Sequence, residues 1–177
     1  MTTTRPQTTD STPSVNELAG KYMTFKLASE EYGVQILKVR ELIGLMDITA
    51  IPRAPEFVRG IINLRGKIIP VLDLRLRFGL PVSADSSQAV IIVTQLATPL
   101  GPLTMGVLVD QVLEVRTIEA AHIEPSPRFP GSASTEFVLG VGKAEARVIL
   151  LLDIECVLAP ARDPLLAEVL ENHALNV

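Results

Sequence analysis

Short apolar runs separated by turn residues dominate the pattern of this chain. Residues 22–27 and 32–36 are rich in β-forming side chains and flank the polar stretch 28–31, which predicts a hairpin. Residues 61–64 and 68–72 predict a second hairpin around Arg65-Gly66-Lys67, because Gly66 can adopt the positive φ of a tight turn.

Other local signals lie between and after these hairpins. A strand is predicted at residues 39–45, with a bend or bulge at Gly44. Residues 55–60 indicate a helical turn, since they begin with proline and end with glycine. Asp73 is placed to cap a short helical stretch at residues 74–78 by accepting a hydrogen bond from a free backbone amide.

The same pattern occurs twice. A shift of 80 positions aligns residues 57–74 with residues 137–154, and a shift of 73 positions aligns residues 33–41 with residues 106–114. The difference between the shifts places an insertion of seven residues, rich in Pro and Ser, in the second copy. Three pairs mark the shared scaffold: Phe57 with Phe137, Gly60 with Gly140, and Asp73 with Asp153. An internal repeat of this kind governs the whole fold.

About five short strands per copy predict a mainly β fold of two small five-stranded barrels with short helices. A unit of roughly 70 residues is near the lower limit for an independent core, so the two units are expected to pack together. We expect a disordered tail at residues 1–19, one domain at residues 20–160 and an amphipathic C-terminal helix at residues 161–177. The domain is expected to consist of two barrel halves, residues 20–88 and 89–160, and an exchange of strands between the halves stays open.

Composition excludes several functional classes. The net charge of −4, the pI near 5.2 and the absence of Trp argue against a nucleic-acid surface. No apolar run reaches the roughly 18 residues that a bilayer crossing needs. The Thr-rich N-terminus lacks the apolar core of a signal peptide, and a single cysteine excludes an internal disulfide, so a soluble cytoplasmic protein is expected. The 47% of hydrophobic residues fits either dense β packing or an apolar patch for a protein partner.

Few side chains are suited to catalysis. His122 and His173 are the two histidines, and no metal-ligand spacing surrounds them. Asp73 and Asp153 occupy equivalent positions before short apolar helices, so capping explains them better than paired acid chemistry does. Neither catalysis nor a cofactor is therefore expected.

The two copies disagree at one hairpin. The first copy has Asn63-Leu64-Arg65-Gly66-Lys67, whereas the second has Lys143-Ala144-Glu145-Ala146-Arg147. With Arg59, the first sequence indicates a basic tip. Such a tip is either a solvated turn or a rigid anchor for a carboxylate on another protein.

Three segments resemble a known family. They are Glu31-Tyr32-Gly33-Val34 with the following 36–41, then 55–60, and above all 63–75, Asn-Leu-Arg-Gly-Lys-Ile-Ile-Pro-Val-Leu-Asp-Leu-Arg. These segments are similar to the CheW chemotaxis coupling proteins, and the similarity extends from about residue 22 to residue 158.

The resemblance implies two SH3-like barrels and a non-catalytic adaptor. It implies that the adaptor joins the cytoplasmic tip of chemoreceptors to the regulatory domain of the CheA histidine kinase, as a monomer recruited from the cytoplasm to membrane-associated receptor arrays without inserting into the membrane. The receptor-binding positions it implies are Val39, Glu41, Gly60, Asn63, Leu64 and Arg65. The kinase-binding positions are Ile123, Glu124, Arg128 and Phe129.

Other functions stay open at this point. A related kinase array that controls surface motility or gene expression would use the same kind of adaptor. A small β barrel could instead bind nucleic acid, although the acidic pI and few aromatic residues argue against it. An enzyme would require His122 to lie beside a carboxylate in a pocket.

Overall fold

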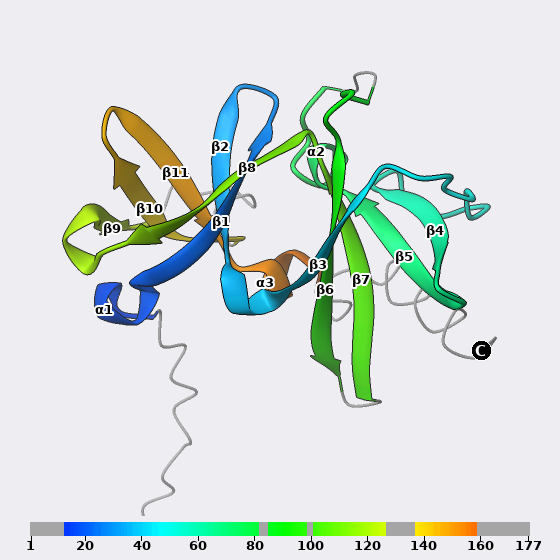
Figure 1. The fold of residues 1–177 in the computed structure, drawn as a ribbon, viewed down its shortest axis with the longest axis horizontal. Helices are drawn as coiled ribbons and strands as arrows, with labels where there is room; N and C mark the ends of the chain where they lie inside the picture. The colour runs from blue at the N-terminus through cyan, green and yellow to red at the C-terminus, as the bar shows by residue number, and fades with distance from the viewer. Residues whose placement is uncertain (1–12, 82–84, 99–100, 127–136, 159–177) are drawn as a thin grey trace, which may run out of the picture.

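The computed structural model describes residues 13–81, 85–98, 101–126 and 137–158. Within them the chain forms two β barrels packed side by side (Figure 1). The predicted mainly β fold of two SH3-like barrels with short helices is confirmed. The predicted C-terminal helix lies outside the described residues. None of the described helices is long and apolar enough to span a membrane.

Barrel 1 is the sheet with strand order β8-β1-β2-β11-β10-β9. Its strands are β1 (Gly20–Leu27), β2 (Glu30–Gln35), β8 (Gln111–Ile118), β9 (Ile123–Pro125), β10 (Val138–Ala144) and β11 (Arg147–Leu152). The short helices α1 (Val15–Leu18), η2 (Ala120–His122) and α3 (Ile154–Leu158) adjoin these strands in the chain.

Barrel 2 is the sheet with strand order β3-β6-β7-β5-β4. Its strands are β3 (Val39–Gly44), β4 (Val58–Leu64), β5 (Lys67–Asp73), β6 (Val90–Thr98) and β7 (Gly101–Val109). The helix η1 (Ile36–Lys38) leads into β3, and α2 (Leu74–Arg77) follows β5. Thr49 and Ile61 exchange two backbone hydrogen bonds of 2.9 Å, which joins the segment after β3 to β4 and closes the barrel.

Neither barrel is one copy of the repeat. Barrel 1 takes its first hairpin, β1–β2, from the first copy and its other strands from the second. Barrel 2 takes β6–β7 from the second copy and β3, β4 and β5 from the first. Parallel pairs join the exchanged parts at equivalent positions: Leu151 lies opposite Gly33, and Val71 lies opposite Gly106. Each copy therefore completes the other.

Among the described residues, the hydrophobic core has three parts. One lies inside barrel 1 and includes Tyr22 and Ile149, and a second lies inside barrel 2 and includes Ile62 and Ile91. The largest cluster includes side chains of both barrels and is lined by Phe25, Tyr32, Met105 and other buried residues. This shared core explains why units of this size need each other.

Arg77 lies at the junction of the two copies. Its guanidinium carbon is 4.6 Å from the ring centroid of Phe57 and 5.2 Å from that of Phe137, the repeat partner of Phe57. Its Nε donates to the carbonyl of Val157 at 3.3 Å, and position 157 is the repeat counterpart of position 77. One cation thus contacts equivalent elements from both copies.

Several local predictions are wrong. Residues 15–18, expected in a disordered tail, form α1, which Ser14 and Glu17 cap reciprocally and whose Leu18 is buried. The bulge of β3 lies between Val39 and Glu41, not at Gly44. The expected loop after β8 includes η2 and β9.

The predicted helical turn at residues 55–60 is only one turn, closed by the Val58 amide on the Pro55 carbonyl at 2.9 Å. Gly60 does not end it. This glycine lies within β4, at a bulge and with φ of +143°. By contrast, the capping role of Asp73 is confirmed, because its side chain accepts from the amides of Arg75 and Leu76.

Candidate partner-binding site

The β4–β5 hairpin forms a rigid tip at one end of barrel 2. Arg65 and Gly66 both have positive φ, 53° and 83°, as a two-residue turn of this type requires. The Asn63 side chain accepts the Gly66 amide at 2.9 Å and so fixes the turn. The Lys67 ammonium donates to the Thr104 hydroxyl of β7 at 3.0 Å. The tip therefore presents Arg65 on a backbone that has little freedom.

Arg65 pairs with Glu41 across the end of barrel 2. Its Nη2 donates to both carboxylate oxygens of Glu41 at 2.7 Å, which links the β4–β5 tip to β3. The Arg65 side chain is 71% exposed and the Glu41 side chain 32%. We call this end of barrel 2 the Arg65 mouth: Glu41, Asn63, Leu64, Arg65, Lys67 and Thr104. Two of the predicted receptor-binding residues, far apart in sequence, thus meet here.

Two of the predicted receptor-binding residues contribute to the scaffold. Gly60 is buried, and a Cβ there would lie 2.0 Å from the Thr49 carbonyl oxygen, so this position allows the strand closure. Gly60 is therefore corrected from a contact to a structural residue. Val39 is half-buried and packs against the core shared by the barrels. Leu64 is half-buried above the core of barrel 2, at the edge of the mouth.

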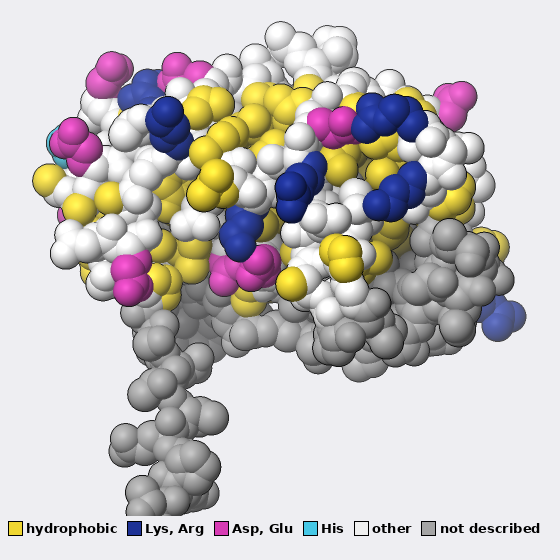
Figure 2. All heavy atoms as spheres, turned by 60° about the horizontal axis from the view of Figure 1, so that its bottom comes forward, with side chains coloured by type: hydrophobic (Ala, Val, Ile, Leu, Met, Phe, Trp, Pro, Cys, Tyr) yellow, Lys and Arg dark blue, Asp and Glu magenta, His cyan; other side chains and the backbone are white. Residues whose placement is uncertain are grey.

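Exposed apolar side chains accompany Glu41 on β3 and the adjoining segments. Leu37 is 91% exposed, and Leu42, Leu45 and Met46 are between 37% and 42% exposed. Figure 2 shows a face of the molecule on which Lys and Arg side chains lie among hydrophobic ones. Such a mixture of exposed leucines and basic groups is typical of a surface that binds another protein.

Arg59 does not belong to the basic tip. It lies near the start of β4, where its Nη1 donates to Asp73 at 3.1 Å and its guanidinium makes two bonds to Asp85, of 2.9 and 3.1 Å. These bonds hold the pKa of the Asp85 carboxyl below its usual range and raise the pKa of Arg59. The sequence placed Arg59 with Arg65 because both are basic and close in the chain, but they lie near opposite ends of one strand.

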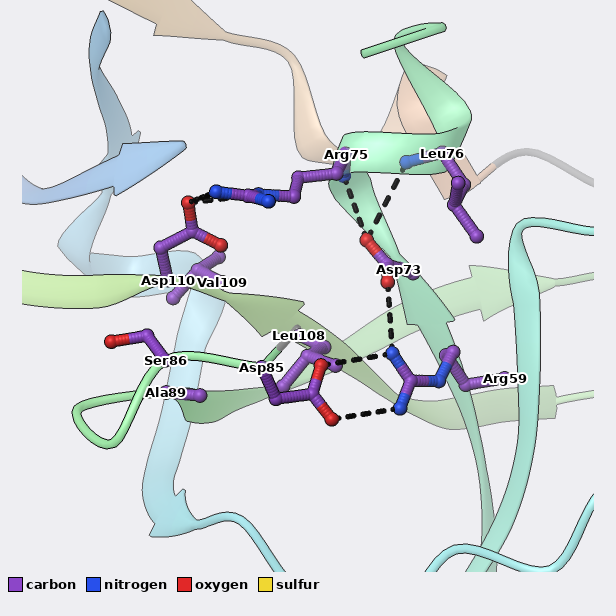
Figure 3. A pocket seen from close by; sticks show the side chains of 10 residues that line it. All are labelled: Arg59, Asp73, Arg75, Leu76, Asp85, Ser86, Ala89, Leu108, Val109 and Asp110. Atoms are coloured by element: carbon purple, nitrogen blue, oxygen red, sulfur yellow. Dashed lines mark hydrogen bonds and ion pairs between the residues drawn. The ribbon is translucent and has the colours of Figure 1, made fainter. Parts of the chain in front are cut away.

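A small cavity of about 50 Å³ adjoins this network (Figure 3). Arg75 donates from Nε and Nη2 to one carboxylate oxygen of Asp110, which also accepts the Ala28 amide of the β1–β2 turn at 2.7 Å. Figure 3 shows the charged side chains turned toward one another rather than toward an empty centre. The network joins β4, β5, α2 and the residue between β7 and β8, and no sequence pattern had indicated it.

The predicted kinase-binding residues divide into three groups. Ile123 is 5% exposed and packs in the core of barrel 1, so it is corrected from a contact to a core residue. Glu124 is exposed on β9 and accepts from the Lys143 ammonium on β10. Arg128 and Phe129 lie outside the described residues.

Comparisons with known proteins agree on one family. The model of the CheW-like domain matches residues 21–161. The chemotaxis protein CheW of Klebsiella aerogenes is 36% identical over 166 residues, which cover 90% of this chain and 97% of that protein. Protein FrzA of Myxococcus xanthus is 33% identical over 147 residues, which cover 80% of this chain and 87% of that protein.

A solved structure is similar as well. The crystal structure of the scaffolding protein TtCheW from Thermoanaerobacter tengcongensis matches with a TM-score of 0.70 and 39% sequence identity. The match covers 80% of this chain and 93% of that chain.

Proposed function

This chain belongs to the CheW family and is a chemotaxis coupling adaptor, and we propose that its Arg65 mouth binds the cytoplasmic tip of a chemoreceptor. The observation that carries the proposal is the Arg65–Glu41 pair, which holds an exposed guanidinium at the end of a barrel whose strand β3 and adjoining segments also carry exposed leucines. A planar guanidinium on a rigid turn binds a carboxylate at little cost in conformational entropy.

The internal ion pair sets how the receptor binds. Glu41 is contacted by Nη2 alone, so the guanidinium has donors left for a carboxylate of the receptor. A receptor carboxylate can share Arg65 with Glu41, and the leucines and Met46 on and after β3 supply apolar contact around it. Asn63 acts through the turn that it fixes, since its side-chain oxygen is bonded to the Gly66 amide.

The kinase is proposed to bind barrel 1, on the side of β9. The family resemblance supports Glu124, Arg128 and Phe129 as contacts with the regulatory domain of CheA, and Glu124 is exposed as a contact must be. Coupling then acts by binding: receptor and kinase held on different barrels of one adaptor have a raised effective concentration, and a rearrangement of the receptor tip shifts the kinase between states. This role needs neither catalysis nor a cofactor. The adaptor is proposed to be a monomer in isolation that joins receptor arrays at the membrane.

One titration tests the receptor site. Arg65→Ala is expected to weaken binding of a soluble receptor-tip fragment by about 1–3 kcal/mol, the usual range for loss of a charge-assisted anchor. The unfolding midpoint is expected to change little, because an exposed ion pair contributes at most about 1 kcal/mol. Lys26→Ala removes an exposed positive charge from barrel 1 and serves as the control. Unchanged affinity of Arg65→Ala would reject the site.

A separate measurement tests the kinase site. Phe129→Ala is expected to reduce association with the kinase and leave receptor-tip binding unchanged. Co-sedimentation of the variant with kinase and receptor at wild-type levels would contradict this assignment.

The alternative is a related kinase array that controls surface motility or gene expression. The similarity to protein FrzA supports keeping it, whereas the relatives named for chemotaxis favour the main proposal. Reconstitution with the receptors and kinases of the same bacterium would separate the two.

A further inference from the structure

The Arg65 mouth has a counterpart on barrel 1. The repeat places Glu145 at the position of Arg65, Arg147 at that of Lys67, Glu114 at that of Glu41, and Glu31 at that of Thr104. Strand pairing places these positions alike in space, because β11 pairs with β2 as β5 pairs with β7. Even the backbone of the turn agrees, with φ of 57° at Glu145 and 53° at Arg65. We call this end of barrel 1 the Glu145 mouth.

The two mouths face different sides of the molecule. In Figure 1 the connection between β10 and β11 lies at the upper left, and the connection between β4 and β5 lies at the lower right. A partner on one mouth therefore leaves the other mouth accessible.

The cations of the Glu145 mouth are directed at its own carboxylates. Arg147 lies 3.4 Å from Glu31 and 3.6 Å from Glu114, and Arg116 donates to Glu114 at 2.7 and 3.0 Å. The hydrogen bond to Glu114 is the main reason why the pKa of Arg116 is raised, and the charges of Glu145 and Glu31 add to it. No comparable set of acids surrounds Arg65, whose side chain meets Glu41 alone among the described ion pairs.

Glu31 disfavours the binding of a further anion at the Glu145 mouth. Its side chain is 8% exposed, and its Oε1 has no hydrogen-bond partner among the described residues. The neutral Thr104 occupies the same position in the Arg65 mouth and accepts a bond from Lys67. A carboxylate that approached the Glu145 mouth would meet a buried carboxylate and an acidic turn where the Arg65 mouth offers a hydroxyl and a guanidinium.

The two mouths differ in the formal charge of the residues at equivalent positions. Arg65, Lys67, Glu41 and Thr104 sum to +1, because two cations face one carboxylate. With Lys143, which stands at the position of Asn63, the residues Glu145, Arg147, Glu114 and Glu31 sum to −1, because three carboxylates face two cations. Arg116, which replaces Ile43 of β3, offsets this negative charge. The Arg65 mouth is therefore positive, whereas the Glu145 mouth is neutral and carries three carboxylates in place of one.

We infer that Glu145 and Glu31 are specificity-determining residues, which exclude from barrel 1 the carboxylate-bearing partner that barrel 2 binds. This inference rests on the proposed receptor site. Two similar barrels could otherwise bind two receptor tips, or bind one in either of two orientations. The added carboxylates of the Glu145 mouth give the adaptor a single receptor-binding end and therefore a fixed direction between receptor and kinase.

The test transplants the charge pattern of one mouth onto the other. The probe is a soluble fragment of the receptor cytoplasmic tip, titrated by calorimetry. The wild-type adaptor is expected to bind one tip per chain, and Arg65→Glu to lose at least about tenfold in affinity through like-charge repulsion. Adding Glu31→Thr and Glu145→Arg to Arg65→Glu is expected to recover the affinity to within about threefold of wild type by opening the second mouth.

Hydrogen exchange shows where the recovered partner binds, which a purely structural effect would not change. Protection on tip binding is expected at residues 63–67 in the wild type and at residues 143–147 in the triple variant. Glu119→Arg in the Arg65→Glu background makes the same charge change as Glu145→Arg, at an exposed residue after the far end of β8, and is expected to recover nothing.

The outcomes are distinct. A folded triple variant without recovered binding, or with protection elsewhere, overturns the inference and leaves the receptor site standing. If Arg65→Glu binds like wild type, the proposed receptor site fails and the inference fails with it. If Glu31→Thr prevents folding, the test uses Glu145→Arg alone in the Arg65→Glu background, because this exposed turn accepts Arg in the same conformation as Arg65. This variant is expected to bind the tip at least about threefold more tightly than Arg65→Glu. No recovery of affinity would overturn the inference.

Discussion

The capping aspartates Asp73 and Asp153 occupy equivalent positions in the repeat but have different surroundings. Both donate their amide to the carbonyl of an equivalent phenylalanine, at 2.7 Å to Phe57 and 2.8 Å to Phe137. Asp73 is buried and also accepts from Arg59, whereas Asp153 is half-buried and accepts from the amide of Cys156. The residue at the position of Arg59 in the second copy is a leucine.

This comparison separates the structural features that both copies keep from those in which the copies differ. The preserved part is backbone: the Phe carbonyl, the capping aspartate and the strand bulge recur with the same hydrogen bonds. The part that differs is the polar environment around that backbone, which in the first copy includes the ion network of Arg59, Asp73 and Asp85. The two mouths differ by the same principle. Substitutions at equivalent positions can therefore measure how far the copies have diverged.

The largest difference is expected at the paired glycines of β4 and β10. A Cβ at Gly60 would lie 2.0 Å from the Thr49 carbonyl oxygen, and its φ of +143° strains any other residue. Gly60→Ala is expected to lower the free energy of unfolding by more than about 3 kcal/mol. Gly140 is less restricted, with the Glu124 carbonyl oxygen at 2.9 Å, so Gly140→Ala is expected to cost about 1–2 kcal/mol.

Urea unfolding of both variants checks this order. Gly44→Ala provides the control, because a Cβ there meets nothing within 4 Å. Equal losses for Gly60→Ala and Gly140→Ala would show that the backbone at Gly60 in barrel 2 is packed no more tightly than the backbone at Gly140 in barrel 1.

The next difference is expected at the aspartates. Asp73→Ala removes a cap and leaves Arg59 without its most buried partner, so a loss of about 2–3 kcal/mol is expected. Asp153→Ala removes only a cap and is expected to cost about 1 kcal/mol. Denaturant unfolding of Asp73→Ala and Asp153→Ala measures this difference. The variant Arg59→Leu, which copies Leu139 of the second copy, measures the contribution of the ion network to the free energy of unfolding. A double variant Arg59→Leu/Asp73→Ala no less stable than Asp73→Ala would confirm that the extra loss comes from a guanidinium that has lost Asp73 and keeps its bonds to Asp85.

Strand periodicity and turn chemistry predicted most of the elements. The hairpins at 22–36 and 61–72 and the cap at Asp73 are local, since each depends on residues a few positions apart. Gly60 was misassigned because glycine marks both a helix end and a bulge, and only the position of Thr49 decides between them. Even the repeat could not decide the exchange of hairpins, because Gly33 could pair with Val71 of its own copy as well as with Leu151 of the other.

The candidate site was predictable in its residues but not in its geometry. The disagreement between the copies pointed to residues 63–67, and the family resemblance added Glu41. Nothing in the sequence places the Arg65 guanidinium on Glu41, because the contact depends on how the barrel closes between β3 and β4. Arg59 shows the converse: it has the same charge and lies nearby in sequence, but Asp73 and Asp85 hold it away from the tip.

A smaller effect is expected at Arg77, where the two copies meet. Arg77→Ala removes one cation from between Phe57 and Phe137 and is expected to cost about 1 kcal/mol. Arg77→Lys keeps the charge without the planar group and is expected to lose about half as much. If thermal unfolding showed both variants at the wild-type midpoint, the contacts of Arg77 with the two equivalent phenylalanines would add nothing to the stability of the junction.

The smallest effect is a pH dependence at Asp85, in the ion network of the first copy. Bonds from Arg59 hold the pKa of Asp85 below its ordinary value of 3.8, so the folded state favours the charged carboxylate. A depressed pKa stabilises the fold above the ordinary value, and this contribution is lost as the pH falls through the lower folded value. Because Asp85 is partly exposed, Asp85→Asn is expected to cost less than about 1 kcal/mol at neutral pH. Urea unfolding at pH 7 and near pH 3 is expected to show the gap between variant and wild type narrowing with acid. A gap that stays constant would mean that the carboxylate charge of Asp85 does not contribute.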